Sequence, residues 1–352
     1  MKNRVYFDHA AATPVDPRVR KAMEPFLSER FANPSAIHKD GVLARKAVEE
    51  ARRVIAGLLG IHADEIVFTG SATESCNLAL FGAVHAWQKS HRGRVAHIVV
   101  SSIEHDAVLG SARKLEESGV RITKLPVNAS GIVDTKTLKG AIDRDTVLIS
   151  VMYANNEIGA IQPVSDIAKI IRKWKKEVRG VTRIERPEGD ERYPLFHTDA
   201  TQAANYCDMH IPRLGVDMLT MNAAKIYGPK GVGLLAMLRD TPLDPIIIGG
   251  GHERGRRAGT ENVSGIVGFA EAFRIARETM ENESARLTAI RSYAMNELKK
   301  IPGLVINGGE TERLPNNINF SAQNSDPGST AQVDYHSSRT EFVTGHSAAG
   351  HE

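Results

Sequence analysis

Residues 65–87 read EIVFTGSATESCNLALFGAVHAW, and this stretch decides the fold class. The β-rich run Glu65–Thr69 predicts a buried strand, and the run Asn77–Trp87 predicts a helix. Between them, the small residues of Thr69–Ser75 leave free backbone N–H groups and hydroxyl groups at the start of the helix. Such a turn can hold an anion. Taken alone the motif is weak, because a capped strand-to-helix turn has the same residues.

The alternation of strand and helix patterns continues over about 250 residues. Amphipathic helices are predicted at Arg18–Arg30 and Gly41–Leu59. Further β-rich runs lie at Val95–Val100, Arg121–Leu125, Thr146–Met152 and Met218–Met221. Short apolar runs bounded by turn residues are typical of strands that are buried on both faces of a largely parallel sheet. The sequence therefore predicts a three-layer α/β/α domain.

Composition restricts the class of protein. The chain has 352 residues, of which 41% are hydrophobic, so disorder of the whole chain is excluded. A net charge of +3 argues against nucleic acid or an anionic membrane as a partner. We find no membrane-spanning apolar run and no signal peptide, and we expect no metal site. Cys76 and Cys207 are the only cysteines, which indicates a reducing cytoplasm rather than a disulfide scaffold.

Two charged residues follow predicted strands. Asp199, in Phe196–Gln202, comes at the end of a β-type run, where a carboxylate can pair with a protonated ring nitrogen. Lys225 lies just after a strand and before a Gly/Pro-rich turn, among Ala, Ile and Tyr residues that would remove water from it. Loss of water lowers the pKa of a lysine towards the neutral amine that bonds an aldehyde. Each residue alone has an ordinary alternative, a strand-end cap for Asp199 and a surface lysine for Lys225.

Together these features are more specific than each one alone. An anion-binding turn, a strand-end aspartate and a desolvated lysine, in that order, match the phosphate, ring nitrogen and aldehyde of pyridoxal phosphate. His105 follows another predicted strand and is a candidate for stacking on the pyridine ring, with a purely structural histidine as the alternative.

Nine motifs then show a family resemblance. They are YFDHAAATP (6–14), NPSAIH (33–38), TGSATES (69–75), EHDAV (104–108), NNEIGAIQP (155–163), HTDATQ (197–202), KIYGPKG (225–231), GGGHERGRRAGTEN (249–262) and PNNINF (315–320). With these motifs in family order from residue 1 to about residue 320, the chain resembles the cysteine desulfurases of the class V aminotransferases. The resemblance implies the pyridoxal-phosphate fold of type I.

The resemblance also implies residue roles. Lys225 bonds the cofactor aldehyde and moves protons, Asp199 pairs with the ring nitrogen, and His105 stacks on the ring. The other implied contacts are Ala72, Thr73 and Asn222 at the phosphate, Asn155 and Gln202 at the ring substituents, Thr260 from the second subunit of a homodimer, and Asn33 at the substrate carboxylate.

The implied domains are a large cofactor-binding domain at 1–262, whose first 15 or so residues pack on the small domain, and a partial small domain at 263–320. Residues 321–352 contain no Leu, Ile, Met or Lys and predict a disordered tail. The implied reaction converts L-cysteine to L-alanine, and the sulfur passes through an enzyme persulfide to iron–sulfur clusters or thiolated RNA. The implied protein partners are an iron–sulfur scaffold or a sulfur-acceptor protein.

The chain departs from the family pattern in two places. The family usually has a histidine directly before the lysine and a serine two residues further back, where this chain has Ala224 and Asn222. After Phe320 we find neither the Ser/Gly-rich loop with the nucleophilic cysteine nor the late arginine that grips the substrate carboxylate. We therefore expect a truncated or frameshifted end and impaired sulfur transfer. The alternatives are another class V enzyme, a selenocysteine lyase or aminotransferase, and a non-catalytic cofactor-binding partner subunit.

Overall fold

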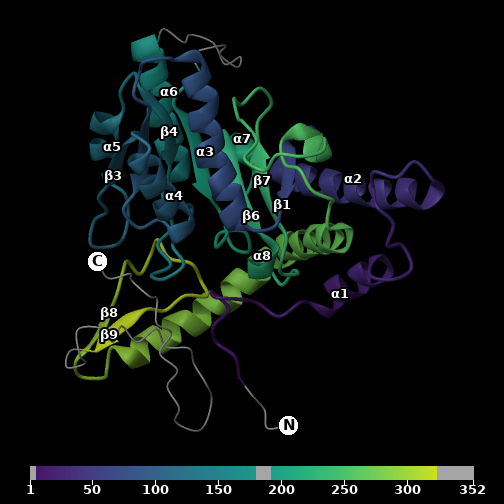
Figure 1. The fold of residues 1–352 in the computed structure, drawn as a ribbon. Helices are drawn as coiled ribbons and strands as arrows, with labels where there is room; N and C mark the ends of the chain where they lie inside the picture. Colours follow the sequence, from purple (N-terminus) through teal and green to yellow (C-terminus); the bar gives the residue numbers. More distant parts are fainter. Residues whose placement is uncertain (1–4, 180–191, 323–352) are drawn as a thin grey trace.

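The computed structural model describes residues 5–179 and 192–322, and its centre is a seven-stranded sheet (Figure 1). The strands are β1 (Ile66–Thr69), β2 (His97–Ser101), β3 (Arg121–Leu125), β4 (Thr146–Ser150), β5 (Leu195–Asp199), β6 (Met218–Asn222) and β7 (Gly233–Met237). Their order is β1-β7-β6-β5-β4-β2-β3. Among these seven strands, β7 alone runs in the direction opposite to the rest, so the predicted, largely parallel sheet is confirmed.

Helices cover both faces of this sheet. The α-helices are α1 (Pro17–Met23), α2 (Lys39–Leu59), α3 (Ala72–Ser90), α4 (Asp106–Glu117), α5 (Thr135–Ala141), α6 (Val164–Arg179), α7 (Ile211–Leu214) and α8 (Val263–Leu298). Shorter 3₁₀ turns lie at Glu24–Phe26, Ala63–Glu65, Ala223–Lys225 and His252–Gly255. None of the described helices is long and apolar enough to cross a membrane.

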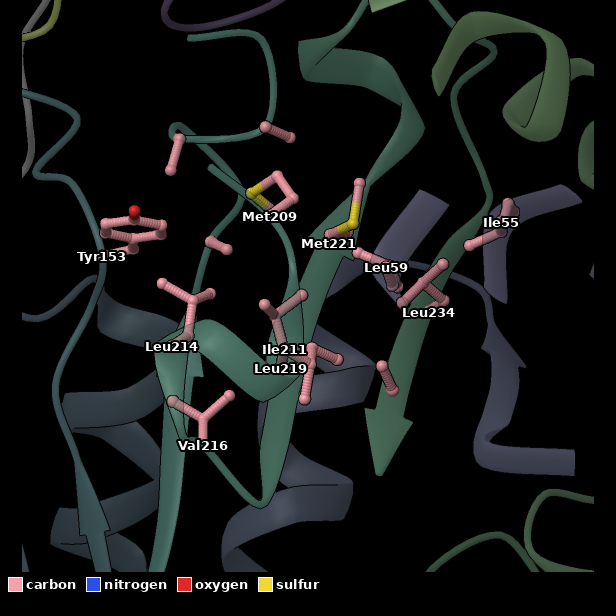
Figure 2. Close-up of a cluster of buried hydrophobic side chains, with 14 of the residues drawn as sticks. Ile55, Leu59, Tyr153, Met209, Ile211, Leu214, Val216, Leu219, Met221 and Leu234 are labelled. Carbon is pink, nitrogen blue, oxygen red and sulfur yellow. The ribbon is translucent and has the colours of Figure 1, made fainter. Parts of the chain in front are cut away.

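Successive residues of a strand point to opposite faces of the sheet, so their side chains pack into two separate cores. In β2, Ile98 and Val100 pack with α3 and α4, whereas Val99 belongs to the core on the opposite face. Figure 2 shows part of that second core, where Ile55 and Leu59 of α2 lie near residues of β6 and β7. The predicted three-layer α/β/α arrangement is therefore confirmed.

The first predicted helix is shorter than expected. The pattern predicts Arg18–Arg30, but α1 ends at Met23 and a 3₁₀ turn follows. Pro25 explains the difference, since proline has no N–H to donate to the carbonyl four residues earlier. The second helix, predicted from Gly41, begins two residues earlier at Lys39, where the His38 side chain accepts a hydrogen bond from the Gly41 N–H.

The 36-residue helix α8 links the sheet domain to a small antiparallel pair, β8 (Leu304–Ile306) and β9 (Phe320–Ala322) (Figure 1). Residues of its first half, such as Phe269 and Phe273, are fully buried in the core with α2. The predicted domain boundary at residue 262 stays a prediction. The tail predicted from residue 321 lies outside the described residues apart from its first two.

Candidate active site

A cavity of about 450 Å³ lies where the carboxyl ends of the parallel strands meet the start of α3. In sheets of this kind, the crevice beyond the strand carboxyl ends is the usual place for a ligand. The predicted site residues that line it are Ala72, Thr73, His105, Asp199, Gln202, Asn222 and Lys225. Sequence segments more than 150 residues apart, from Ala72 to Lys225, therefore meet in one place.

Lys225 ends the short 3₁₀ turn that follows β6. Its Nζ donates a hydrogen bond to the Ala10 carbonyl oxygen at 2.8 Å and a second one to the Ala11 carbonyl oxygen. Burial lowers the pKa of Lys225, and the carboxylates of Asp8 and Asp199 act in the opposite direction. The predicted desolvation of this lysine is thus present, and it favours the neutral amine.

Asp199 is the last residue of β5, and its side chain is buried at the cavity wall. One carboxylate oxygen, Oδ1, accepts a hydrogen bond from the Thr201 backbone N–H at 2.9 Å. The other, Oδ2, lies 3.7 Å from the thiol of Cys76, which donates to it. These contacts hold a carboxylate at a fixed position beside the cavity.

His105 is the N-cap residue of α4. Its Nδ1 accepts a hydrogen bond from the Ala107 backbone N–H at 3.0 Å, so a neutral ring carries its proton on Nε2. The rest of the ring is exposed and borders the cavity. The imidazole is therefore oriented by its own helix.

Glu104, directly before His105, is a buried carboxyl that the sequence did not single out. Its Oε1 accepts hydrogen bonds from the Ser101 hydroxyl at 2.5 Å and the Met152 N–H at 2.7 Å. Its Oε2 has no hydrogen-bond partner among the described residues. Burial raises the pKa of Glu104 to about 8, so the carboxyl stays largely protonated at neutral pH. Glu104 ties the end of β2 to the cavity segment at Met152.

The predicted anion-binding turn, Thr69–Ser75, has the expected strand–turn–helix form. Ser71 is the N-cap of α3, and its hydroxyl accepts a hydrogen bond from the Glu74 N–H at 3.2 Å. The turn fits closely against β7, since a Cβ on Gly233 would lie 2.6 Å from the Ser71 carbonyl carbon. Glycine is required at that position so that the strand can approach the turn.

Three predicted residues do not line this cavity. The Asn155 amide is already engaged: its Nδ2 donates to the Ile103 carbonyl in the loop after β2 at 3.0 Å, and its Oδ1 accepts from the Glu157 and Ile158 N–H groups of its own loop at 2.9 Å. Its neighbours Asn156 and Glu157 border the cavity instead. Asn33 and Thr260 are exposed and lie elsewhere on this chain. Their assigned roles stay predictions, and Thr260 was predicted to act in a second subunit.

The N-terminal segment forms one wall that the residue assignments missed. Asp8, Ala10 and Ala11 line the cavity, and the Gln202 side chain donates to the Ala10 carbonyl at 2.9 Å. Thr13 donates through both its N–H and its hydroxyl to the Ala224 carbonyl. The motif at residues 6–14 was the available signal. The hydrogen bonds that residues 10–16 of this wall make to distant parts of the chain go to residues 202–230, within the predicted large domain.

Both cysteines are buried. Cys76 is fully buried, and burial together with the Asp199 carboxylate raises the pKa of its thiol well above the usual value. Burial raises the pKa of Cys207 to about 12. A nucleophilic sulfur must be an accessible thiolate. Neither thiol meets that condition.

Comparisons with known proteins agree with this geometry. The model of the class-V aminotransferase family matches residues 5–181 and 189–350. The cysteine desulfurase IscS of Dictyoglomus turgidum is 45% identical over 322 residues, which cover 91% of this chain and 76% of that protein. The chain belongs to the class-V aminotransferase family, among its cysteine desulfurases. Enzymes of this family depend on pyridoxal phosphate, which is the cofactor of this protein.

Solved structures of the family have the same fold. A NifS-like protein superposes with a TM-score of 0.82 at 37% identity, covering 91% of this chain and 82% of that one. SspA in complex with cysteine superposes with a TM-score of 0.74 at 34% identity, covering 91% and 84%. The likeness confirms the predicted type I fold.

The residues present fit pyridoxal phosphate. A desolvated amine on Lys225, a fixed carboxylate on Asp199 and the first turn of α3 face one cavity, so each reactive part of the cofactor has a partner of suitable chemistry. Within the described part of the chain, no group of three or more His, Cys, Asp or Glu side chains is arranged to hold a metal ion.

Proposed function

We propose that this cavity binds pyridoxal phosphate and L-cysteine and carries out the cysteine desulfurase reaction up to sulfur transfer. The observation that carries the proposal is that Lys225, Asp199 and the start of α3 line one cavity. The likeness to SspA, whose structure is a complex with cysteine, supports the substrate.

The bound cofactor supplies an electron sink for electrons released at the substrate carbon. Lys225 Nζ is the amine that holds the cofactor and moves protons on the substrate carbon. The Asp199 carboxylate keeps a facing ring nitrogen protonated, because a negative charge in a buried place favours the cationic partner. Ala72 and Thr73, in the first turn of α3, hold the phosphate.

The sulfur acceptor is the distinctive part of the proposal. Because the thiols of Cys76 and Cys207 are buried with raised pKa values, neither is available to take sulfur from the substrate. We assign that role to a thiol other than these two, such as one on a sulfur-acceptor or iron–sulfur scaffold protein. Burial of both cysteines also favours the second candidate, a cofactor-binding subunit without turnover.

A cofactor titration tests the binding half of the proposal. The purified protein with added pyridoxal phosphate is expected to be yellow, and Lys225→Ala removes the visible absorption band. Lys169→Ala, at an exposed lysine of α6, is the matched control and keeps it. A wild-type protein that stays colourless would overturn the assignment.

A product assay tests the sulfur step. We expect L-cysteine to change the visible spectrum while little or no L-alanine accumulates. Any alanine formed with an added thiol reductant should be unaffected by Cys76→Ser or Cys207→Ser. Loss of alanine formation in either variant would show that the buried thiol takes part.

We also propose a homodimer. Large apolar side chains such as Phe31 and Ile37 are 78% and 95% exposed on this single chain, which is typical of a surface covered in an assembly. The exposed Thr260 is then free to serve the partner's phosphate site. The cytoplasmic location stays a prediction.

A further inference from the structure

An ion pair joins the loop at residues 249–260 to the anion-binding turn. Arg257 Nε lies 2.7 Å from Glu74 Oε1, and its Nη2 lies 3.3 Å from Oε2. The two side chains are only 22% and 18% exposed, so solvent screens the pair less than it would a surface pair. The residues are 183 positions apart in the sequence, and the contact therefore fixes two separate segments.

Glu74 shapes the turn directly. Its Oε2 accepts a hydrogen bond from the Gly70 N–H at 2.8 Å, while its own N–H donates to the Ser71 hydroxyl. A Cβ at Gly70 would lie 2.9 Å from the same carboxylate oxygen. The carboxylate thus closes the turn immediately before Ala72 and Thr73, which line the cavity.

The loop that delivers Arg257 has a rigid base. Glu253 pairs with Arg52 through two contacts of 2.7 and 2.9 Å, and both side chains are 2% exposed. Glu253 Oε2 also accepts the Phe68 N–H of β1 at 2.8 Å. Glu253 and Arg254 have φ values of 46° and 58°, a left-handed conformation that persists only where the surroundings hold it. Arg257 therefore approaches Glu74 from a fixed direction.

The negative charge of Glu74 explains why the ion pair with Arg257 matters for a bound phosphate. Glu74 lies in the same helical turn as Thr73, so its charge, if unpaired, would repel a phosphate group bound at the start of α3. Its hydrogen bond to Gly70 nevertheless requires an acceptor at this position. Arg257 cancels the charge and leaves the acceptor in place.

We propose that Arg257 is a positioning residue for the cofactor phosphate, which acts by neutralising Glu74 while Glu74 holds the turn. This inference rests on the proposed phosphate site at Ala72 and Thr73. Arg257 itself is not among the residues that line the cavity.

The test compares pyridoxal phosphate with pyridoxal, which has the same aldehyde and no phosphate. Affinities are measured by titrating visible absorption in wild type, Arg257→Gln, Glu74→Gln and the double variant. For Arg257→Gln we expect on the order of tenfold weaker pyridoxal phosphate binding and unchanged pyridoxal binding. Glu74→Gln keeps an acceptor for Gly70 and leaves the Arg257 charge unpaired, so it should bind pyridoxal phosphate at least as tightly as wild type. It should also restore most of the affinity in the double variant.

The control is Arg213→Gln, which removes one positive charge from an exposed pair with Asp208 and should leave both affinities unchanged. Equal losses for the two aldehydes in Arg257→Gln, or no rescue by Glu74→Gln, would overturn the inference and indicate a purely structural pair. A wild-type protein that binds neither aldehyde would instead refute the proposed function.

Discussion

The buried carboxyl of Glu104 makes a measurable prediction about stability and pH. Its pKa is raised from 4.5 to about 8 because burial disfavours the charged form. In the unfolded chain the group ionises above about pH 4.5, whereas in the folded protein it stays protonated until about pH 8. The folded state therefore binds more protons in this window, and the contribution of Glu104 to stability falls as pH rises through it.

The size of this decline in the free energy of unfolding follows from the linkage between proton binding and folding. One extra bound proton changes the free energy of unfolding by about 1.4 kcal/mol per pH unit, hence by about 2.7 kcal/mol between about pH 5.5 and 7.5. Glu104→Gln resembles the protonated acid, since its amide oxygen can still accept from the Ser101 hydroxyl and the Met152 N–H. The free energy of unfolding of Glu104→Gln should therefore not show this decline as pH rises.

Urea unfolding of the cofactor-free protein at several pH values in this range measures the difference. Buried histidines such as His97 and His197 have lowered pKa values and add an opposite dependence, but they are the same in both proteins and cancel. Glu116→Gln, at an exposed position of α4, is the control and should follow wild type. Parallel curves for wild type and Glu104→Gln would refute the reasoning, because they would mean that Glu104 is ionised in the folded protein.

Three further predictions follow from other parts of the structure. Asp199→Ala should retain some cofactor but react with cysteine far more slowly, since the ring nitrogen loses its charge partner; stopped-flow absorbance at the wild-type rate would contradict this. Light scattering of the cofactor-bound protein should give twice the 38.4 kDa of one chain, and a monomer at micromolar concentration would argue against the homodimer. Glu253→Ala should lower the free energy of unfolding by about 3–5 kcal/mol, because it leaves the Arg52 charge buried without its partner. Urea unfolding measures this loss, with Glu50→Ala, which removes an exposed ion pair with Arg53, as the control. Equal losses of unfolding free energy in the two variants would contradict the prediction.

The sequence predicted most of the sheet because most of its strands are buried on both faces. The run Glu65–Thr69 differs from the fully buried β1 by one residue. The run Arg121–Leu125 matches β3 at both ends, although β3 is an edge strand in which only Leu125 is buried. The strand β7 was not among the predicted runs, and its direction was not predictable in this way either. A buried antiparallel strand has the same apolar pattern as a parallel one, and only its pairing with β1 and β6 sets its direction.

The site residues could be predicted where a reactive side chain lies at or just after the end of a strand. Asp199 ends β5, Lys225 and His105 each follow a strand, and the topology brings such positions to one edge of the sheet. Asn155 differs because its amide is used by the backbone of its own loop, a local competition that residue type alone does not reveal. The Arg257–Glu74 pair was hidden because it depends on a contact between distant segments.

The position of Cys76 links the electrostatics of the site to the question of the sulfur acceptor. A thiolate at this position would place a second negative charge 3.7 Å from the Asp199 carboxylate in a fully buried place. Such a pair is unfavourable, so the thiol keeps its proton and donates it towards Asp199 instead. That donor stabilises the single charge that the cofactor ring requires. The same contact that suits Cys76 to support Asp199 therefore makes it unsuitable as a nucleophile, and this supports the proposal that a different thiol accepts the sulfur.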